Sequence, residues 1–270
     1  MAVKEVALLE RSVRQQPDNM PSMHVHAHHE VYFLLAGQRR YFIGHTIYDV
    51  TPGNLVFIPA GQLHRTTTPT GVGYERYLLS FDEADTGALT DAVGRDAWNH
   101  LLHSGCLQLP PEAARQVQRI LEQLEQELTR ALPYGEAVMG HLLQAVLLTA
   151  LRFGKPKPPS TAESADKVQE VARYISENFS QELTLEDAAK MACMERTYFS
   201  KRFKKLTGVG FYEYLTKTRL TEAQRLLTQT QLPVGEIAER CGFSSGNYFG
   251  DVLRSYTGLS PTAWRRRTEK

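Results

Sequence analysis

The C-terminal part of the chain contains one pattern twice, and this repeat limits what the region can fold into. Residues 183–214 align with residues 232–264 at an offset of 49, which becomes 50 after one inserted residue. The recurring residues are Ala189 and Ala238, Tyr198 and Tyr248, Phe199 and Phe249, Thr207 and Thr257, and Gly208 and Gly258. Each copy predicts a short helix, at 186–191 and 235–240, followed by a turn and a longer helix. The sequence therefore predicts a duplicated helix-turn-helix.

The longer helix of the first copy has the side chains expected of a helix that reads DNA. Its polar residues are Glu195, Arg196, Thr197, Ser200, Lys201, Arg202, Lys204 and Lys205. We expect Tyr198, Phe199 and Phe203 to form its buried stripe. A helix fits the major groove, where cations and hydroxyls reach phosphates and base edges. Either copy alone is also consistent with an ordinary solvated helix, but the duplication favours DNA binding.

Charge and composition exclude several other classes of protein. Residues 166–270 carry 17 Lys and Arg against 13 Asp and Glu, whereas residues 1–165 carry 14 against 17, which permits a nucleic-acid partner for the C-terminal part. The first ten residues contain no apolar run of signal-peptide length, and the longest apolar stretch, 142–151, is roughly half of a membrane span. The three cysteines have no metal-type spacing. We expect a cytoplasmic protein with no membrane partner.

A family pattern covers the second copy and the segment between the copies. Its residues in the second copy are Ile237, Ala238, Gly242, Phe243, Tyr248, Phe249, Gly258, Leu259, Ser260 and Pro261. After the first copy they are Arg219, Ala223, Leu226, Leu227 and Thr230. On these residues about 100 residues of the chain resemble the DNA-binding domain of the AraC/XylS family. The resemblance implies two helix-turn-helix units on a rigid linker helix, which read two successive major grooves about 34 Å apart.

The resemblance also assigns residues to the DNA interface. In the first recognition helix they are Glu195, Arg196, Thr197, Ser200 and Lys201, with Lys204. In the second they are Ser245, Gly246, Asn247 and Asp251, with Arg254. The second set departs from the family pattern because Gly246 has no side chain and Asp251 stands where a basic residue is common. We expect the first unit to supply most of the affinity and the second mainly to position the protein.

The N-terminal part has a different periodicity. In residues 20–81, short runs of β-branched and aromatic residues alternate with Gly and Pro, which predicts an all-β barrel. Residues 111–153 change to helical spacing and predict two helices, the second apolar on more than one face. Such helices pack on the barrel, pair with another subunit, or do both. We expect a homodimer.

Two short motifs in the barrel segment indicate a binding site. His24, His26, Glu30 and Gly37 fit H-x-H-x3-E-x6-G, and Gly53, Pro59, Gly61 and His64 fit G-x5-P-x-G-x2-H. Both motifs resemble those of the cupin barrel, except that Thr68 stands where the second motif ends in Asn. His24 and His26 share one face of a strand, and three imidazoles with a carboxylate suit a divalent transition metal. The alternative is that these side chains hydrogen-bond a small ligand directly; His28 and His29 leave open which imidazoles point inward.

An effector is expected inside the barrel. The residues predicted to line its site are His24, His26, Glu30, Tyr32, Arg40 and His64. Tyr41, Arg65, Tyr74 and Arg76 lie near them in sequence and have side chains that stack on or hydrogen-bond a polar metabolite. The resemblance implies a sugar as the commonest effector of relatives with this architecture.

The predicted fold is α+β, with three parts. Residues 1–153 form a cupin-like barrel with helices, for effector sensing and dimerisation. Residues 154–165 contain Pro156, Pro158 and Pro159 and predict an extended linker. Residues 166–270 form an all-α domain with two helix-turn-helix units joined by a linker helix.

These features predict a ligand-responsive transcription activator. It would bind promoter DNA, contact RNA polymerase, and respond to effector through the disposition of the dimer helices and DNA-binding domains. One alternative is a metal-dependent cupin enzyme fused to a DNA-binding domain. The motif has no obvious acid/base partner, however, so we expect no enzymatic activity. The other alternative is an architectural DNA-binding protein without an effector.

Overall fold

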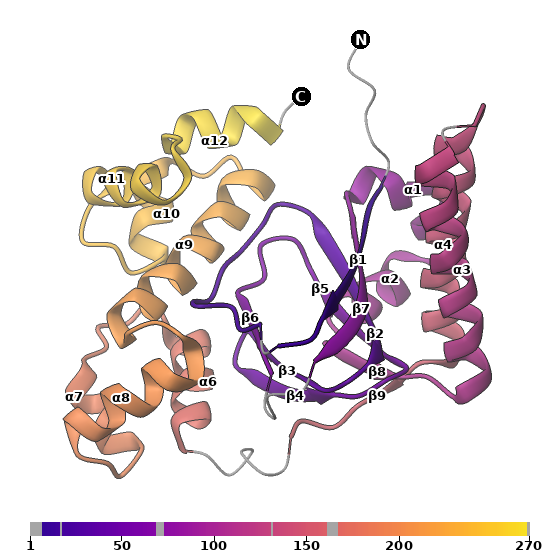
Figure 1. The fold of residues 1–270 in the computed structure, drawn as a ribbon. Helices are drawn as coiled ribbons and strands as arrows, with labels where there is room; N and C mark the ends of the chain where they lie inside the picture. The colour runs from indigo at the N-terminus through magenta and orange to yellow at the C-terminus, as the bar shows by residue number, and fades with distance from the viewer. Residues whose placement is uncertain (1–6, 17, 69–72, 131, 161–166, 269–270) are drawn as a thin grey trace. The chain divides into compact units, whose positions relative to one another are not determined.

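A computed structural model describes residues 7–16, 18–68, 73–130, 132–160 and 167–268 of the chain (Figure 1). The chain divides into two compact units. The first comprises Met1–Met20, Val25–Ile43 and Ile47–Thr161, and the second comprises Pro21–His24, Gly44–Thr46 and Ala162–Lys270. A unit rich in β-strands with helices and an all-helical unit together confirm the predicted α+β fold.

The first unit is built from two antiparallel sheets. Its strands are β1 (Ala7–Arg14), β2 (His29–Ala36), β3 (Arg39–Ile43), β4 (Thr46–Val50), β5 (Asn54–Ile58), β6 (His64–Thr67), β7 (Tyr74–Phe81), β8 (Cys106–Gln108) and β9 (Lys155–Pro156). The larger sheet has the order β1-β7-β2-β5-β8-β9, and the smaller one β4-β3-β6. Strand β1, which pairs with β7 along its whole length, was not predicted.

The run of apolar residues in β2 is explained by burial of both faces of the larger sheet. Val31 and Phe33 belong to a core shared with the helices, whereas Tyr32 and Leu34 belong to a core between the two sheets. Because successive side chains of a strand point to opposite faces, a strand covered on both sides is continuously apolar. The core between the sheets also receives Tyr41 from β3.

Helices cover the outer face of the larger sheet (Figure 1). They are the 3-10 helix η1 (Glu83–Thr86), α1 (Gly87–Val93), α2 (Arg95–Leu102), α3 (Pro111–Arg130) and α4 (Gly135–Phe153). Helices α3 and α4 lie side by side, at the positions predicted. Helix α4 is, by length and composition, apolar enough to cross a membrane. Its residues Leu143, Val146 and Leu147 are nevertheless fully buried in this core, as in a core helix of a globular domain.

The described part of the predicted linker is attached to the first unit. Strand β9 pairs with β8 at the edge of the larger sheet, a place where a proline's missing N–H group is tolerated. Beyond it, the Lys157 amide donates to the Cys106 carbonyl at 2.9 Å, and the buried Ser160 hydroxyl donates to Asp49. The start of the predicted linker is therefore extended but docked; residues 161–165 lie outside the described residues.

The second unit consists of helices (Figure 1). They are α6 (Lys167–Asn178), α7 (Leu185–Met191), α8 (Arg196–Thr207), α9 (Phe211–Gln229), α10 (Val234–Arg240), α11 (Gly246–Thr257) and α12 (Pro261–Thr268). The pairs α7–α8 and α10–α11 are the two predicted helix-turn-helix units. The start of α9 packs Phe211 against Phe203 of α8, while Leu227 near its end joins the core of α10 and α11. Helix α9 is thus the linker helix between them.

Candidate functional site

Helix α8 exposes most of the residues predicted to contact DNA. It carries five cations, Arg196, Lys201, Arg202, Lys204 and Lys205. Side chains of Thr197 and Lys201 are exposed, and Ser200 is half-buried. Glu195 has a second role, because its carboxylate accepts a hydrogen bond from the Tyr198 amide at 2.9 Å and caps the helix. Bonds from the Thr197 and Tyr198 amides lower the pKa of Glu195, so the cap stays ionised.

Helix α11 occupies the same position in the second copy with fewer charges. Ser245 caps it, as Glu195 caps α8: its hydroxyl accepts from the Tyr248 amide at 3.2 Å. Asn247, Asp251 and Arg254 are exposed, so the helix offers one acid and one cation. A Cβ atom on Gly246 would lie 3.4 Å from the Gly235 Cα of α10, an ordinary van der Waals contact, so packing against α10 does not require a glycine at this point.

One part of the predicted buried stripe is wrong. Phe199 and Phe203 are fully buried, but Tyr198 is 54% exposed, and Tyr248 in the second copy is 53% exposed. Each tyrosine precedes the buried phenylalanine by one residue, which rotates its side chain by about 100° on a helix, away from the core. The two tyrosines are candidate DNA contacts that the sequence analysis missed, although their repetition in both copies was the available signal.

In the first unit, histidines gather around Glu30. The Nε2 atoms of His26 and His28 lie 3.1 and 3.3 Å from the carboxylate oxygens, and that of His64 lies 4.0 Å away. Burial by itself raises the pKa of Glu30, but bonds from His26 and His28 and the charges of His26 and His64 outweigh it and lower the pKa to about 2. Glu30 is therefore a carboxylate at neutral pH.

The imidazoles are oriented by main-chain carbonyls. The Nδ1 atom of His26 lies 2.7 Å from the His28 carbonyl, and that of His64 lies 2.9 Å from the Gln62 carbonyl. A carbonyl only accepts, so each Nδ1 carries a proton; Nε2, the atom that faces Glu30, donates to that carboxylate when the ring is protonated and offers its lone pair to a metal ion when the ring is neutral. Ligand atoms of His26, His28 and Glu30 lie within 4.8 Å of one another. This donor set fits a divalent transition metal.

Of the two remaining histidines in this segment, His29 lies apart from the cluster and His24 lies close to it. His29 points to the outer face of β2, where its Nδ1 atom accepts from the Ala60 amide at 3.0 Å and burial lowers its pKa. Its ring packs 5.4 Å from that of Phe81. His24 is half-buried, and its ligand atom lies within 4.8 Å of those of His26 and His64. The structure therefore brings together His24, His26, Glu30 and His64, the whole predicted set, and adds His28.

A buried polar cluster follows the histidines along the inner face of the first unit. Tyr32 is 2% exposed and its ring packs 5.0 Å from that of Tyr41. Arg40 does not join them, since its Nε atom donates to Asp49 on β4 at 2.7 Å. Arg39, one residue earlier on β3, is the arginine on the inner face and is 3% exposed. The sequence analysis placed Arg40 in the site instead of Arg39. Adjacent residues on a strand point to opposite faces, so this difference of one residue puts the predicted side chain on the wrong face.

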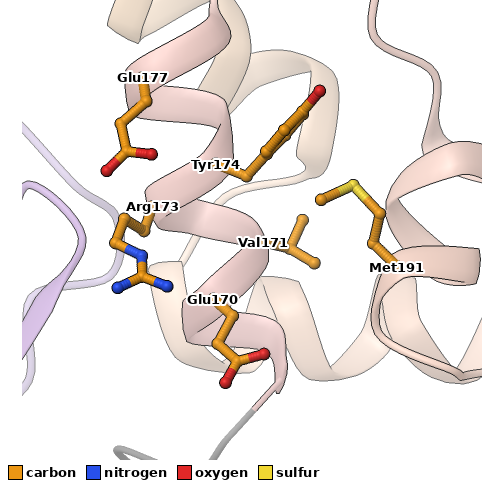
Figure 2. A pocket seen from close by; sticks show the side chains of 6 residues that line it. All are labelled: Glu170, Val171, Arg173, Tyr174, Glu177 and Met191. Carbon is orange, nitrogen blue, oxygen red and sulfur yellow. The ribbon is translucent and has the colours of Figure 1, made fainter.

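A separate hollow of about 220 Å³ lies in the second unit (Figure 2). Its walls come from α6 and from Met191 at the end of α7; the other lining residues are Glu170, Val171, Arg173, Tyr174 and Glu177. None of these six residues was predicted to contact DNA or effector.

Comparison with known proteins agrees with the division of the chain into two units. A family model described as "AraC-like ligand binding domain" matches residues 8–146, and one described as "Helix-turn-helix domain" matches residues 188–267. Among curated relatives, the HTH-type transcriptional activator RhaR of Enterobacter sp. (strain 638) is 27% identical over 264 residues, covering 94% of this chain and 90% of the relative. The protein of that name from Mannheimia succiniciproducens is 25% identical over 249 residues, covering 91% and 87%.

Solved structures resemble the chain in part or over its length. The C-terminal domain of AraT from Geobacillus stearothermophilus is 38% identical, with a TM-score of 0.37, and covers 38% of this chain and 86% of its own. ToxT from Vibrio cholerae is 12% identical, with a TM-score of 0.38, and covers 97% and 98%. The family models decide the assignment, because the ligand-binding model alone matches half of the chain. The chain belongs to the AraC family of helix-turn-helix transcription regulators, which are not enzymes, and its N-terminal part is an AraC-like ligand-binding domain.

Proposed function

We propose that the protein activates transcription from promoters that it binds through α8 and α11, in response to a small polar effector bound in the first unit. The observation that carries the proposal is the duplicated helix-turn-helix with five cations on its first recognition helix. The relatives named transcriptional activators support activation rather than repression. A sugar is the effector class that the family resemblance suggests. We place the protein in the cytoplasm, where promoter DNA and RNA polymerase are its partners.

In-vitro transcription tests the sign of regulation. A promoter containing a site selected by the purified protein is transcribed by RNA polymerase with and without protein, and with a panel of sugars. We expect more transcript with protein, and a further change with one sugar. Less transcript at every protein concentration would show a repressor. Binding with no sequence preference would instead favour an architectural protein.

We also propose that Glu30 and the imidazoles around it hold a divalent transition metal. Nitrogen and carboxylate ligands of this kind suit zinc, iron, nickel or copper. The metal would supply an attachment point for effector oxygen atoms, while the main-chain carbonyls at His26 and His64 keep the rings oriented.

Metal analysis of purified protein tests this site. Protein prepared without chelator is expected to contain about one metal ion per chain, since a complete first ligand shell binds tightly. His26→Ala should lose the metal, because it removes a ligand whose Nε2 atom lies 3.1 Å from the Glu30 carboxylate. His100→Ala is the matched control, since His100 is exposed on α2. A metal-free wild type would favour direct hydrogen bonding of these side chains to the effector.

A homodimer through α3 and α4 is the third part of the proposal. Leu128 on α3 is 37% exposed, Leu132 between the helices is 53% exposed, and Val138, Leu148 and Phe153 on α4 are 38%, 45% and 40% exposed. Exposed apolar side chains along neighbouring helices are typical of a subunit interface.

The substitution Leu148→Asp tests the dimer. A charge buried in an interface is expected to raise the dimer dissociation constant by about tenfold or more, equivalent to at least 1.4 kcal/mol. Light scattering over a range of concentrations measures the change. Leu8→Asp is the control, because Leu8 is 57% exposed on β1. Equal dissociation constants for Leu148→Asp and wild type would place the interface elsewhere.

A further inference from the structure

Arg39 is the one buried arginine in the described part of the chain. Its Nη1 atom donates to two neutral oxygens, the main-chain carbonyl of Asp18 at 2.6 Å and the Thr68 hydroxyl. The guanidinium lies over the Tyr74 ring, 4.0 Å from its centroid. Its Nε–H group is buried and has no acceptor. A guanidinium stays charged at all physiological pH values, so its burial is costly without a counter-charge.

Other arginines of the same unit have carboxylate partners. Arg11 pairs with Glu75 at 2.6 Å, Arg40 with Asp49 at 2.7 Å, and Arg76 with Glu10 at 3.1 Å. Within the described residues Arg39 forms no such ion pair. The carboxylate of Asp18, the acid whose main chain it contacts, is 56% exposed and accepts from the Tyr74 hydroxyl at 3.1 Å. The fold therefore buries a positive charge, and no carboxylate of the residues that the structure describes forms an ion pair with it.

Two further polar groups beside Arg39 are also without hydrogen bonds. The Tyr32 hydroxyl lies near the Arg39 and Arg76 guanidinium groups; the charges of both and a contact with Arg39 offset part of the rise in pKa that burial gives Tyr32, yet this contact does not satisfy the hydroxyl or the Arg39 Nε–H at full hydrogen-bonding geometry. The Thr66 hydroxyl is buried without a partner, opposite Tyr41 in the β3–β6 pairing and two residues before Thr68. Buried polar groups in native proteins are nearly always satisfied, so three together on one inner face mark a place for a polar ligand.

We propose that the effector carries an anionic group, a carboxylate or a phosphate, that binds Arg39 through Nε–H, with hydroxyl groups of the same molecule reaching Tyr32 and Thr66. This inference rests on the proposed function and narrows it from polar metabolites in general to acidic ones, such as sugar acids. An anionic group would form an ion pair with the Arg39 guanidinium and would also accept a hydrogen bond from its Nε–H group. A neutral sugar meets only the hydrogen bonds and leaves the buried charge uncompensated.

Thermal unfolding of the full chain with simple anions tests the inference. The probes are sodium acetate, sodium phosphate and sodium D-glucuronate, each against sodium chloride of equal ionic strength and against D-glucose. We expect at least one anion to raise Tm saturably, by roughly 3 °C at about tenfold excess over its Kd. A rise in Tm with phosphate but not with acetate or glucuronate would show that the site binds phosphate groups, and the reverse result would show that it binds carboxylates.

Two variants locate the effect. Arg39→Met should abolish the anion-specific shift, whereas Arg40→Met, the neighbouring residue on the opposite face of β3, should keep it. Should Arg39→Met not fold, Arg39→Lys makes the same comparison: it keeps the charge but lacks the Nε–H group, so anion affinity falls by about tenfold or more.

Three results would overturn the inference. The first is an anion shift of equal size in wild type and the Arg39 variants, and the second is no shift beyond that of chloride in the wild type. The third is a neutral sugar that stabilises wild type and Arg39→Met equally. In each case, transcription that still increases when the protein is added would leave the proposed function standing, so the two failures are distinguishable.

Discussion

Lys201→Ala is expected to weaken binding to a specific DNA site by about ten- to a hundredfold, whereas Asn247→Ala weakens it by no more than about threefold. The reason is the charge of the two recognition helices. Helix α8 carries five cations, whereas the exposed charges of α11 are Asp251 and Arg254. An acid near phosphate oxygens is repulsive, so we expect α11 to contribute little to affinity.

Fluorescence anisotropy at several salt concentrations checks this prediction. If Lys201 contacts a phosphate, its removal also reduces the slope of log K against log salt by about 1. Lys190→Ala is the control, since Lys190 is exposed on α7 and pairs with Glu186 in the same helix. Losses of equal size for Lys201→Ala and Asn247→Ala would contradict the unequal roles of the two copies.

Gly242→Ala is expected to destabilise the second unit by about 3 kcal/mol. Gly242 lies in the turn between α10 and α11 with φ at +77°, a conformation that costs a residue with a Cβ atom roughly 1–2 kcal/mol. The new Cβ would in addition lie 2.6 Å from the Ser180 carbonyl oxygen and 2.9 Å from its Cα, so main chain must move. DNA binding should weaken with the displacement of α11.

Gly258→Ala separates the two causes of this loss. Its φ of +75° is nearly the same, but no atom lies within 4 Å of the added Cβ, so only the conformational cost of about 1–2 kcal/mol is expected. The chain has two tryptophans, so in a Trp98→Phe background Trp264 alone reports urea unfolding of the second unit. Equal losses for Gly242→Ala and Gly258→Ala would show that the contact with Ser180 is unimportant.

The second unit was predicted well because its information is local and appears twice. Apolar residues at helical spacing fix α7, α8, α10 and α11, and the repeat confirms each pair by the other. The misplaced residue, Tyr198, shows the limit. In a stretch of consecutive aromatic residues the helical period does not decide which one faces the core, and this depends on how Phe203 packs against Phe211 and Tyr214 of α9.

The first unit was predicted less completely because its pairing is long-range. Strand β1 is stabilised by β7, about 67 residues away, and its own alternation is weak, with Leu8 and Val13 more than half exposed. The incorrect prediction of Arg40, in place of Arg39, as a residue of the inner face has a similar cause. Two adjacent arginines on a strand point to opposite faces, and only the register of β3 with β6 determines which one enters the core.

The most direct test of the central claim is a genome-wide footprint of the purified protein on fragmented DNA from its own source. A regulator with two reading helices predicts a few strongly protected sites that share a bipartite motif, its halves about one helical turn apart. Genes beside these sites would indicate the effector class. Weak, even coverage of the genome would contradict sequence-specific regulation and leave the ligand-binding domain as the part to be explained.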